Sequence, residues 1–391
     1  MDRRTFVTSL GVGATVGLAG CVIDDSGGNG SGNGNGNESG SGNGNGDGGG
    51  NGDGNGDGNE SGNGDTTAED VNVGMVYSSG GLGDESFNDM AYNGVEQAEA
   101  DFGISYQNAE PDSPADMNDY QREFAGSGEY DLVCCIGFDH VTDLVQNAQE
   151  FSDQQFVLVD AVAETEGGDL VENVDNYVFR EHEGSFQVGH LAGLLTTMEY
   201  DHGAASTSPD DPHVGFVGGQ ETAIIDRFEA GYIAGAEYAN EDIEVSTAYA
   251  GSWDDPGTGQ EIATTMYDNG ADIVFHAAGA TGGGVFEAAQ SAERYAIGVD
   301  DDQSISAEGF SDVIVASMVK RVNTAVYESI ESVVNGEFEG GSVQDLGLEE
   351  DGVEAVIGQD FEGELPGEVT DALAETREGI IGGDIEVPEE T

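Results

Sequence analysis

Short apolar runs alternate with longer amphipathic segments from residue 71 onward. Runs of about four to eight apolar residues are typical of buried strands, whereas apolar positions three and four residues apart are typical of helices. The pattern predicts strands at 71–77, 104–107, 131–136, 156–160, 177–179, 214–217, 243–249, 272–277, 295–300 and 313–316. It predicts helices at 87–101, 117–125, 141–151, 183–198, 225–240, 259–269 and 283–293, with another helix after the last strand.

This alternation predicts an α/β fold. Strands joined by helices of this length form parallel, doubly wound sheets with right-handed crossovers. The pattern restarts after Glu183, which indicates two similar lobes. In such sheets ligands bind beyond the carboxyl ends of the strands, so polar residues at those positions are the candidate site residues.

The N-terminus carries an export pattern. Arg3-Arg4-Thr-Phe-Val is a twin-arginine motif, and a short apolar segment at 10–19 is too short to span a bilayer. Leu18-Ala-Gly-Cys21 is similar to a lipobox. We therefore expect residues 1–21 to be a signal peptide and the protein to reach the cell surface by the twin-arginine route. Lipidated Cys21 would anchor it to the outer face of the cytoplasmic membrane.

Residues 22–69 consist almost entirely of Gly, Asn, Ser, Asp and Glu. Such a segment cannot bury apolar surface, so we expect a disordered tether. As a random coil of roughly 45 residues, its ends would lie on the order of 35–40 Å apart. Glycosylation sequons begin at Asn29, Asn37 and Asn59, and in so Asn-rich a tract they could equally be accidents of composition.

The chain has 79 acidic and 9 basic residues, a formal net charge of -70. We interpret the acid as a surface adaptation to a very salty medium, where it keeps the protein soluble. No basic face exists to neutralise phosphates, which excludes nucleic acid as a partner.

Neither the cysteines nor the histidines suggest a metal or cofactor site. Cys134 and Cys135 are adjacent, so in a strand they face opposite sides and should be unpaired, buried apolar residues. The six histidines are scattered, and His182-Glu183 lacks the second histidine of a zincin motif.

Polar and aromatic residues follow the predicted strands. The loop after the first strand offers Asp84, Phe87 and Asn88 near a helix N-terminus, although Asp84 or Ser86 could simply cap that helix. Later strand ends supply Phe138, Asp160, Trp253, Gly279, Gly282 and Asp300. Trp253, the only tryptophan, could stack on a ring or merely pack under a loop.

Lys320 is the only lysine of the chain and follows the predicted strand at 313–316. An ammonium there and the carboxylate of Asp300 at the neighbouring strand end could hold a ligand's hydroxyl groups. The Gly279–Gly282 loop lacks the spacing of a phosphate-binding loop. The available groups therefore favour a neutral ligand with hydroxyls and a flat ring.

Several of these segments resemble one family in the same order along the chain. They are Gly83-Asp-Glu-Ser-Phe-Asn88, Val214-Gly-Phe-Val-Gly-Gly219, Phe228-Glu-Ala-Gly-Tyr232, Ala277-Ala-Gly-Ala-Thr-Gly282, Ala296-Ile-Gly-Val-Asp-Asp-Asp-Gln303 and Ala316-Ser-Met-Val-Lys320. Together they resemble the basic membrane lipoprotein (PnrA-like) family, here of a haloarchaeal type. Its best-known members are purine-nucleoside receptors of ABC importers.

The resemblance implies a type I periplasmic-binding fold with two lobes and a hinge. It implies that Asp300 and Lys320 bind ribose hydroxyls and that Phe87 and Trp253 enclose the base. It also implies that Asn88, Asp160 and the Gly279–Gly282 loop add polar contacts. Where purine-binding members usually carry an acid that bonds the base edge, this chain has Ser78.

We expect residues 302–312 to lead into a crossover between the lobes. This would place 70–181 and 314–340 in lobe 1, and 182–313 and 341–391 in lobe 2. Asp300 would then belong to lobe 2 and Lys320 to the start of a lobe 1 helix, so that both hold one ligand from opposite sides.

The first functional hypothesis is a monomeric binding protein that delivers a nucleoside to the permease and ATPase subunits of an ABC importer. A second keeps the fold and changes the ligand to a sugar or another polar molecule, or the role to a sensor. A distant third is a tethered hydrolase or nucleosidase that uses the acids 300–302. Consecutive acids on an extended strand cannot all face one ion, and no nucleophile–base pair accompanies them.

Overall fold

The structure is a computed structural model that describes residues 71–391. The predicted twin-arginine signal, the lipidation at Cys21 and the glycine-rich tether with its sequons fall on residues 1–70, outside the described residues. The described residues belong to one compact unit of the chain.

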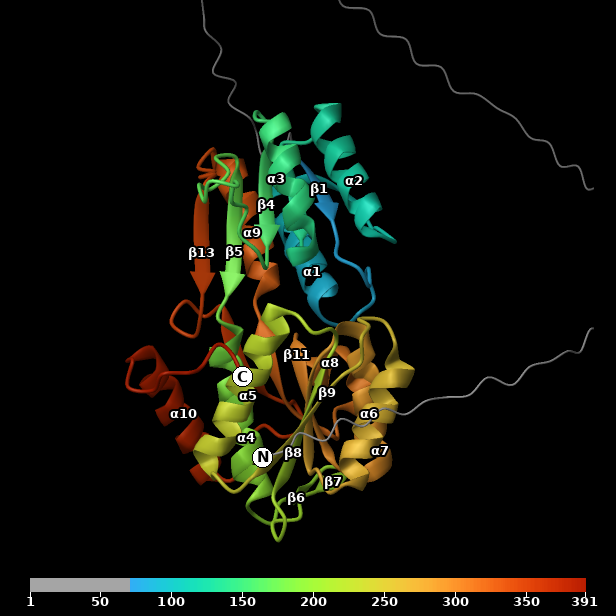
Figure 1. The fold of residues 1–391 in the computed structure, drawn as a ribbon, viewed down its shortest axis with the longest axis vertical. Coiled ribbons are helices and arrows are strands. Elements are labelled where there is room, and N and C mark those ends of the chain that lie inside the picture. Colours follow the sequence, from blue (N-terminus) through green and yellow to red (C-terminus); the bar gives the residue numbers. More distant parts are fainter. Residues whose placement is uncertain (1–70) are drawn as a thin grey trace, which may run out of the picture. The chain divides into compact units, whose positions relative to one another are not determined.

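The first lobe is built on a six-stranded parallel sheet (Figure 1). Its strand order is β13-β5-β4-β3-β1-β2. The strands are β1 (Asn72–Val76), β2 (Ser105–Ala109), β3 (Leu132–Ile136), β4 (Gln155–Val159), β5 (Val174–Phe179) and β13 (Ser342–Leu346). Four helices pack on this sheet: α1 (Phe87–Phe102), α2 (Pro114–Ser127), α3 (Val141–Glu150) and α9 (Val322–Asn335).

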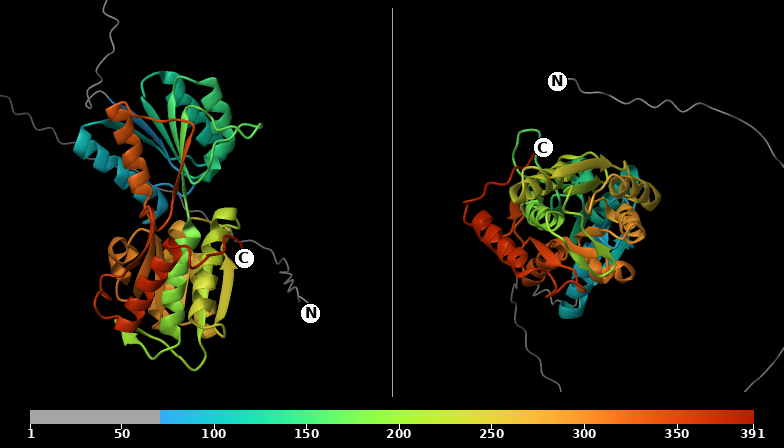
Figure 2. Two further views of the ribbon diagram at one scale, coloured as in Figure 1. Left: turned by 90° about the vertical axis from the view of Figure 1, so that its left-hand side faces the viewer. Right: turned by 90° about the horizontal axis from the view of Figure 1, so that it is seen from below.

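Alternate residues of each strand in this lobe serve two separate cores. In β1, Met75 packs with Met90 of α1, whereas Val76 packs with Phe124 of α2 and Leu144 of α3. This two-residue alternation is why the strands read as nearly continuous apolar runs, since both faces are covered. Figure 2 shows α1 beside α9 on one face of the sheet, with α2 and α3 on the other.

The second lobe has a six-stranded sheet of order β14-β12-β11-β10-β8-β9, in which β14 alone is antiparallel to its neighbour. The strands are β8 (His213–Gly218), β9 (Glu244–Tyr249), β10 (Ile273–Ala277), β11 (Tyr295–Asp300), β12 (Ile314–Lys320) and β14 (Val353–Ile357). Its helices are α4 (Glu181–Thr196), α5 (Ala223–Ala239), α6 (Pro256–Asp268), α7 (Gly283–Ala292), the short α8 (Gln303–Ser306) and α10 (Gly367–Ile381). A small hairpin joins β6 (Asp201–His202) to β7 (Ala205–Ser206), and the 3₁₀ turns η3 (Gly279–Gly282) and η4 (Glu308–Phe310) also lie in this lobe. A further 3₁₀ turn, η2 (Phe138–His140), follows β3 in the first lobe.

The predicted α/β class with two parallel-sheet lobes is confirmed, but two lobe boundaries were wrong. Residues 314–320 form β12, which pairs with β11 in the second sheet rather than belonging to lobe 1. Residues 342–346 form β13, which pairs with β5 in the first sheet rather than belonging to lobe 2. Within residues 71–391 the chain therefore crosses between the sheets three times, after β5, after β12 and after β13.

The predicted end of the strand at residue 316 was also wrong. β12 continues through Ser317 to Lys320, and all seven of its residues are buried. The polar side chains suggested a helix start, but each is buried with a partner. The Ser317 hydroxyl accepts a hydrogen bond from the backbone N–H of Gln303, and Lys320 is ion-paired. The predicted crossover at 302–312 is instead the α8–η4 connection within lobe 2.

Helices α4 and α5 pack so closely that their backbones touch. A Cβ at Gly189 of α4 would lie 2.2 Å from the carbonyl oxygen of Tyr232, and one at Gly235 of α5 would lie 2.1 Å from that of Phe186. Only glycine fits at such contacts. This packing fixes the N-terminal ends of both helices beside the carboxyl end of the second sheet.

Candidate ligand-binding site

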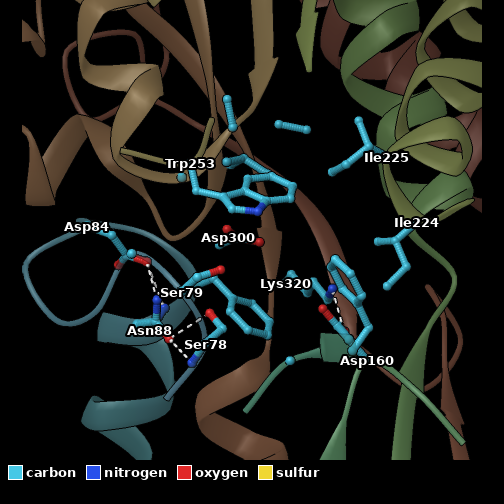
Figure 3. A pocket seen from close by; sticks show the side chains of 18 of the residues that line it. Ser78, Ser79, Asp84, Asn88, Asp160, Ile224, Ile225, Trp253, Asp300 and Lys320 are labelled. Carbon is cyan, nitrogen blue, oxygen red and sulfur yellow. Dashed lines mark hydrogen bonds and ion pairs between the residues drawn. The ribbon is translucent and has the colours of Figure 1, made fainter. Parts of the chain in front are cut away.

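A cavity lies at the carboxyl ends of the strands and is lined by both lobes (Figure 3). It encloses about 670 Å³ of empty space, the solvent at its mouth included. The predicted site residues that line it are Ser78, Asp84, Phe87, Asn88, Phe138, Asp160, Trp253, Gly279, Asp300 and Lys320.

Gly282 is the predicted site residue that the structure does not place in the lining. A Cβ at this position would lie 2.0 Å from the His276 ring, which is buried behind the cavity wall. Gly282 is therefore a packing residue in the described structure.

The carboxylate of Asp84 holds the loop between β1 and α1. It accepts hydrogen bonds from the backbone amides of Ser86, Asn88 and Asp89 at 3.0, 3.0 and 3.2 Å. It also accepts one from the Asn88 side chain at 3.0 Å. Burial raises the pKa of Asp84, and these amide donors oppose that shift. Asp84 therefore acts as the cap of α1, with its acceptors used by the protein itself.

Asn88 links this loop to the end of β1. The backbone amide and the hydroxyl of Ser78 both donate to its side-chain oxygen, at 3.1 and 3.0 Å. The Asn88 amide nitrogen donates in turn to Asp84 (Figure 3). The first-lobe wall is thus held by a continuous polar chain.

The Lys320 ammonium group lies at the other end of the cavity, in a cage of acids and rings. It lies 2.6 Å from the Asp160 carboxylate and 3.1 Å from that of Glu181, the first residue of α4. Its nitrogen also lies 5.2 and 5.8 Å from the ring centroids of Phe87 and Phe228. Burial lowers the pKa of Lys320, but the surrounding carboxylates outweigh it and the net shift is upward, so the ammonium stays charged.

Asp160 directly follows β4 and Asp300 ends β11, and both have a left-handed backbone conformation, with φ of 69° and 65°. Non-glycine residues rarely adopt it, and such strain is typical of sites where a side chain must be aimed. Burial raises the pKa of Asp300 to about 7, with the Lys320 charge opposing the shift. The hydroxyl of Ser86, from the first lobe, donates to the Asp300 carboxylate.

The predicted grip of Asp300 and Lys320 from opposite lobes is wrong, because both end adjacent strands of the second sheet. The contacts between lobes are instead Lys320 with Asp160 and Asp300 with Ser86. A third joins the Gln303 side chain to the carbonyl oxygen of Glu85, at 2.8 Å.

Trp253 covers the middle of the cavity, between the Asn88 and Lys320 ends in the view of Figure 3. Gly219 leaves room for the indole, since a Cβ there would lie 2.4 Å from the ring. The cavity also has lining residues that the sequence analysis did not single out: Ser79, Gly80, Gly137, Asp139, Ile224, Ile225, Phe228, Ala277, Ala278 and Val299. Most of them follow or end a strand, so the same strand-end rule could have found them.

Among residues 71–391, no group of three or more His, Cys, Asp or Glu side chains is arranged to hold a metal ion. Cys134 and Cys135 are both free and buried, as the sequence predicted.

The family comparison adds to this geometry. The model of a family described as ABC transporter substrate-binding protein, PnrA-like, matches residues 71–391. The chain belongs to this family. The predicted resemblance to the PnrA-like family is therefore confirmed, and the two-lobed cleft is that of a PnrA-like substrate-binding protein.

Relatives that match most of this chain are identical to it at about one residue in three. A CD4+ T-cell-stimulating antigen of Listeria innocua is 33% identical over 350 residues, which cover 83% of this chain and 90% of the relative. An ABC transporter nucleoside-binding protein of Lactococcus lactis is 31% identical over 337 residues, covering 82% and 89%. A solved ABC transporter solute-binding protein from Aeropyrum pernix superposes with a TM-score of 0.72 at 28% identity, covering 82% and 94%.

PnrA-like membership assigns a binding role to the cleft. Proteins of this family bind a small molecule and present it to a transporter, and they are not enzymes. The hypothesis of a hydrolase or nucleosidase is therefore set aside.

Proposed function

We propose that the cleft captures a purine nucleoside or a similar nucleoside for an ABC importer. The observation that carries this proposal is the pairing of two features in one cavity. A charged end is formed by Lys320, Asp160 and Asp300, and the rings of Trp253 and Phe87 line the same cavity. A ribose suits the first and an aromatic base the second.

The charge of the cavity supports a nucleoside over a nucleotide. Four carboxylates line it, those of Asp84, Asp139, Asp160 and Asp300, and Lys320 supplies the single ammonium in the lining. A phosphate group would meet net negative charge without a free cation to bind it. The Lactococcus lactis relative, whose name describes nucleoside binding, supports the same ligand class.

The proposal includes the predicted address of the protein. The twin-arginine motif and Cys21 support export and lipid anchoring outside the cytoplasmic membrane, with residues 22–69 as the tether. A lipoprotein of Pyrococcus furiosus, 34% identical over 298 residues, supports the anchored form. The match covers 74% of this chain and 70% of that lipoprotein. None of the helices in residues 71–391 has the length and apolarity needed to cross a membrane.

Tryptophan fluorescence and calorimetry of the purified protein in molar salt test the ligand class. Trp253 is the only tryptophan, so a stacked base would change its emission directly. We expect stoichiometric binding of nucleosides, weaker binding of free bases, and the ligand recovered unchanged. Binding of sugars but not of nucleosides would refute the nucleoside claim and favour a sugar receptor.

A matched pair of variants separates stacking from general disturbance of the fold. Trp253→Leu should weaken nucleoside binding by about tenfold or more, since stacking on an aromatic is worth roughly 1–3 kcal/mol per base. Trp253→Phe should retain most of the affinity. Equal losses in both variants would show that the indole packs under its loop without touching the base.

A further inference from the structure

Four carboxylates line the cleft, and they differ in what already binds them. Asp84 accepts four hydrogen bonds from its own loop and from Asn88. Asp160 is ion-paired with Lys320, and Asp300 accepts from Ser86 and faces the same ammonium. These three are committed to holding the loop and the charged end of the cleft.

Asp139 differs from the other three. It lies in η2, directly after β3, and is exposed. Among residues 71–391 its side chain has one hydrogen bond, from the Ser79 hydroxyl at 3.4 Å, and no ion pair. A carboxylate offers about four acceptor positions, so most of its capacity is unused in the protein.

The position of Asp139 suits the ring end of a nucleoside. In the first sheet β3 lies between β1 and β4, which carry Ser79 and Asp160 just beyond their ends. The Ser79 hydroxyl donates to the Asp139 carboxylate at 3.4 Å, so this carboxylate lies beside Ser79, which is nearer to Asn88 than to Lys320 in the view of Figure 3. A ligand whose sugar occupies the Lys320 end and whose ring lies under Trp253 therefore directs the ring edge toward this side of the cleft.

Ser78 cannot take over the role of an acid at this wall. The Ser78 hydroxyl proton is donated to Asn88, which leaves the serine a weak, neutral acceptor. The unused carboxylate beside it is that of Asp139.

We propose that Asp139 sets the ring specificity of the cleft by accepting hydrogen bonds from N–H groups on the edge of the base. This inference rests on the proposed nucleoside function. A carboxylate is acceptor-only, so it fits a ring edge with two adjacent donors, such as the ring N–H and amino group of guanosine. Adenosine presents one donor beside a bare ring nitrogen, whose lone pair repels the carboxylate. The cleft therefore favours guanosine over adenosine.

The test is a pair of calorimetric titrations in molar salt, one with guanosine and one with adenosine. We expect the unmodified protein to bind guanosine about tenfold or more tightly than adenosine. Asp139→Asn should weaken the binding of guanosine by roughly 10- to 100-fold, because this is the contribution of a hydrogen bond to a charged group. It should leave adenosine unchanged or tighter, because an amide both donates and accepts.

Asp143→Asn is the matched control. It removes the same charge one helical turn further along, from a residue outside the cavity lining. This variant should keep both affinities.

Three outcomes overturn the inference. If the unmodified protein binds both nucleosides equally, or if Asp139→Asn keeps the original ratio, the assignment of Asp139 fails while the nucleoside function stands. If the unmodified protein binds no nucleoside, the proposed function fails and this inference fails with it. The ratio measured on the unmodified protein does not depend on the folding of any variant.

Discussion

Lys320 is buried among acids, and replacing it tests whether the charged end of the cleft is built as described. Lys320→Met keeps the length of the side chain and removes the charge. In the unmodified protein the Lys320 ammonium lies 2.6 Å from Asp160 and 3.1 Å from Glu181, and all three side chains are at most 7% exposed. The variant therefore leaves carboxylates buried without their cation.

The magnitude follows from what each carboxylate retains. Glu181 keeps an ion pair with Arg227 at 3.3 Å. Asp160 has no ion-pair partner other than Lys320 among residues 71–391. Removing one partner of a buried pair costs about 3–5 kcal/mol, because the other charge stays desolvated. We expect Lys320→Met to lower the free energy of unfolding by this amount. The loss should persist in molar salt, because salt screens a buried pair only weakly.

Chemical denaturation, followed by circular dichroism and Trp253 fluorescence, measures the loss. The double variant Lys320→Met/Asp160→Asn is the matched control, since it removes the stranded charge together with its partner. It should recover most of the lost stability, because replacing both members of a buried pair is often nearly neutral. Neither variant should retain full affinity for a nucleoside.

The pH dependence gives a second check on the same reasoning. Burial raises the pKa of Asp160, and Lys320 opposes that shift in the unmodified protein. Without the lysine, the stability lost in Lys320→Met should diminish as the pH falls and Asp160 takes up a proton. The reasoning is refuted if the single variant is as stable as the unmodified protein, or if the double variant is as unstable as the single one.

Two further predictions concern the cleft and its support. Burial raises the pKa of Asp300 to about 7, so its carboxylate is lost as the pH falls through 7. Nucleoside affinity should therefore decrease between pH 8 and pH 6, and Asp300→Asn should bind weakly with little pH dependence; a flat profile in the unmodified protein would contradict the assignment. Gly189→Ala should lower the free energy of unfolding by about 1–3 kcal/mol, because its Cβ would lie 2.2 Å from the Tyr232 carbonyl oxygen. Gly283→Ala is its control at an open helix position, with nothing within 4 Å of the new Cβ, and equal stability of the two variants would show that α4 and α5 can separate without cost.

The fold class and most of the cleft could be predicted from the sequence alone. Strand and helix periodicity is local, so the β1 and β11 runs could be recognised from their own residues. In a parallel sheet every strand delivers its carboxyl end to the same edge, so residues after strands could be assigned to one site without any contact being known. This reasoning placed Phe87, Trp253 and Asp300 in the cavity lining.

Sheet membership required the tertiary structure. β12 joins β11 after a short connection, whereas β13 joins β5, which lies more than 160 residues earlier in the chain. Strand pairing is decided by which edge is free in space, and no periodicity within the strand records it. The lobe boundaries were predicted wrongly at these two strands.

The state of each polar side chain was likewise decided by the fold. Asp84 and Asp139 both read as acids near strand ends, yet the first is enclosed by amide donors and the second keeps most of its acceptors. The single lysine indicated a need for an ammonium, but only the folded chain brings Asp160 and Glu181 to it. Burial and pairing set the charge of a side chain and decide which of its hydrogen-bond acceptors stay free. Both depend on residues that are distant in the sequence.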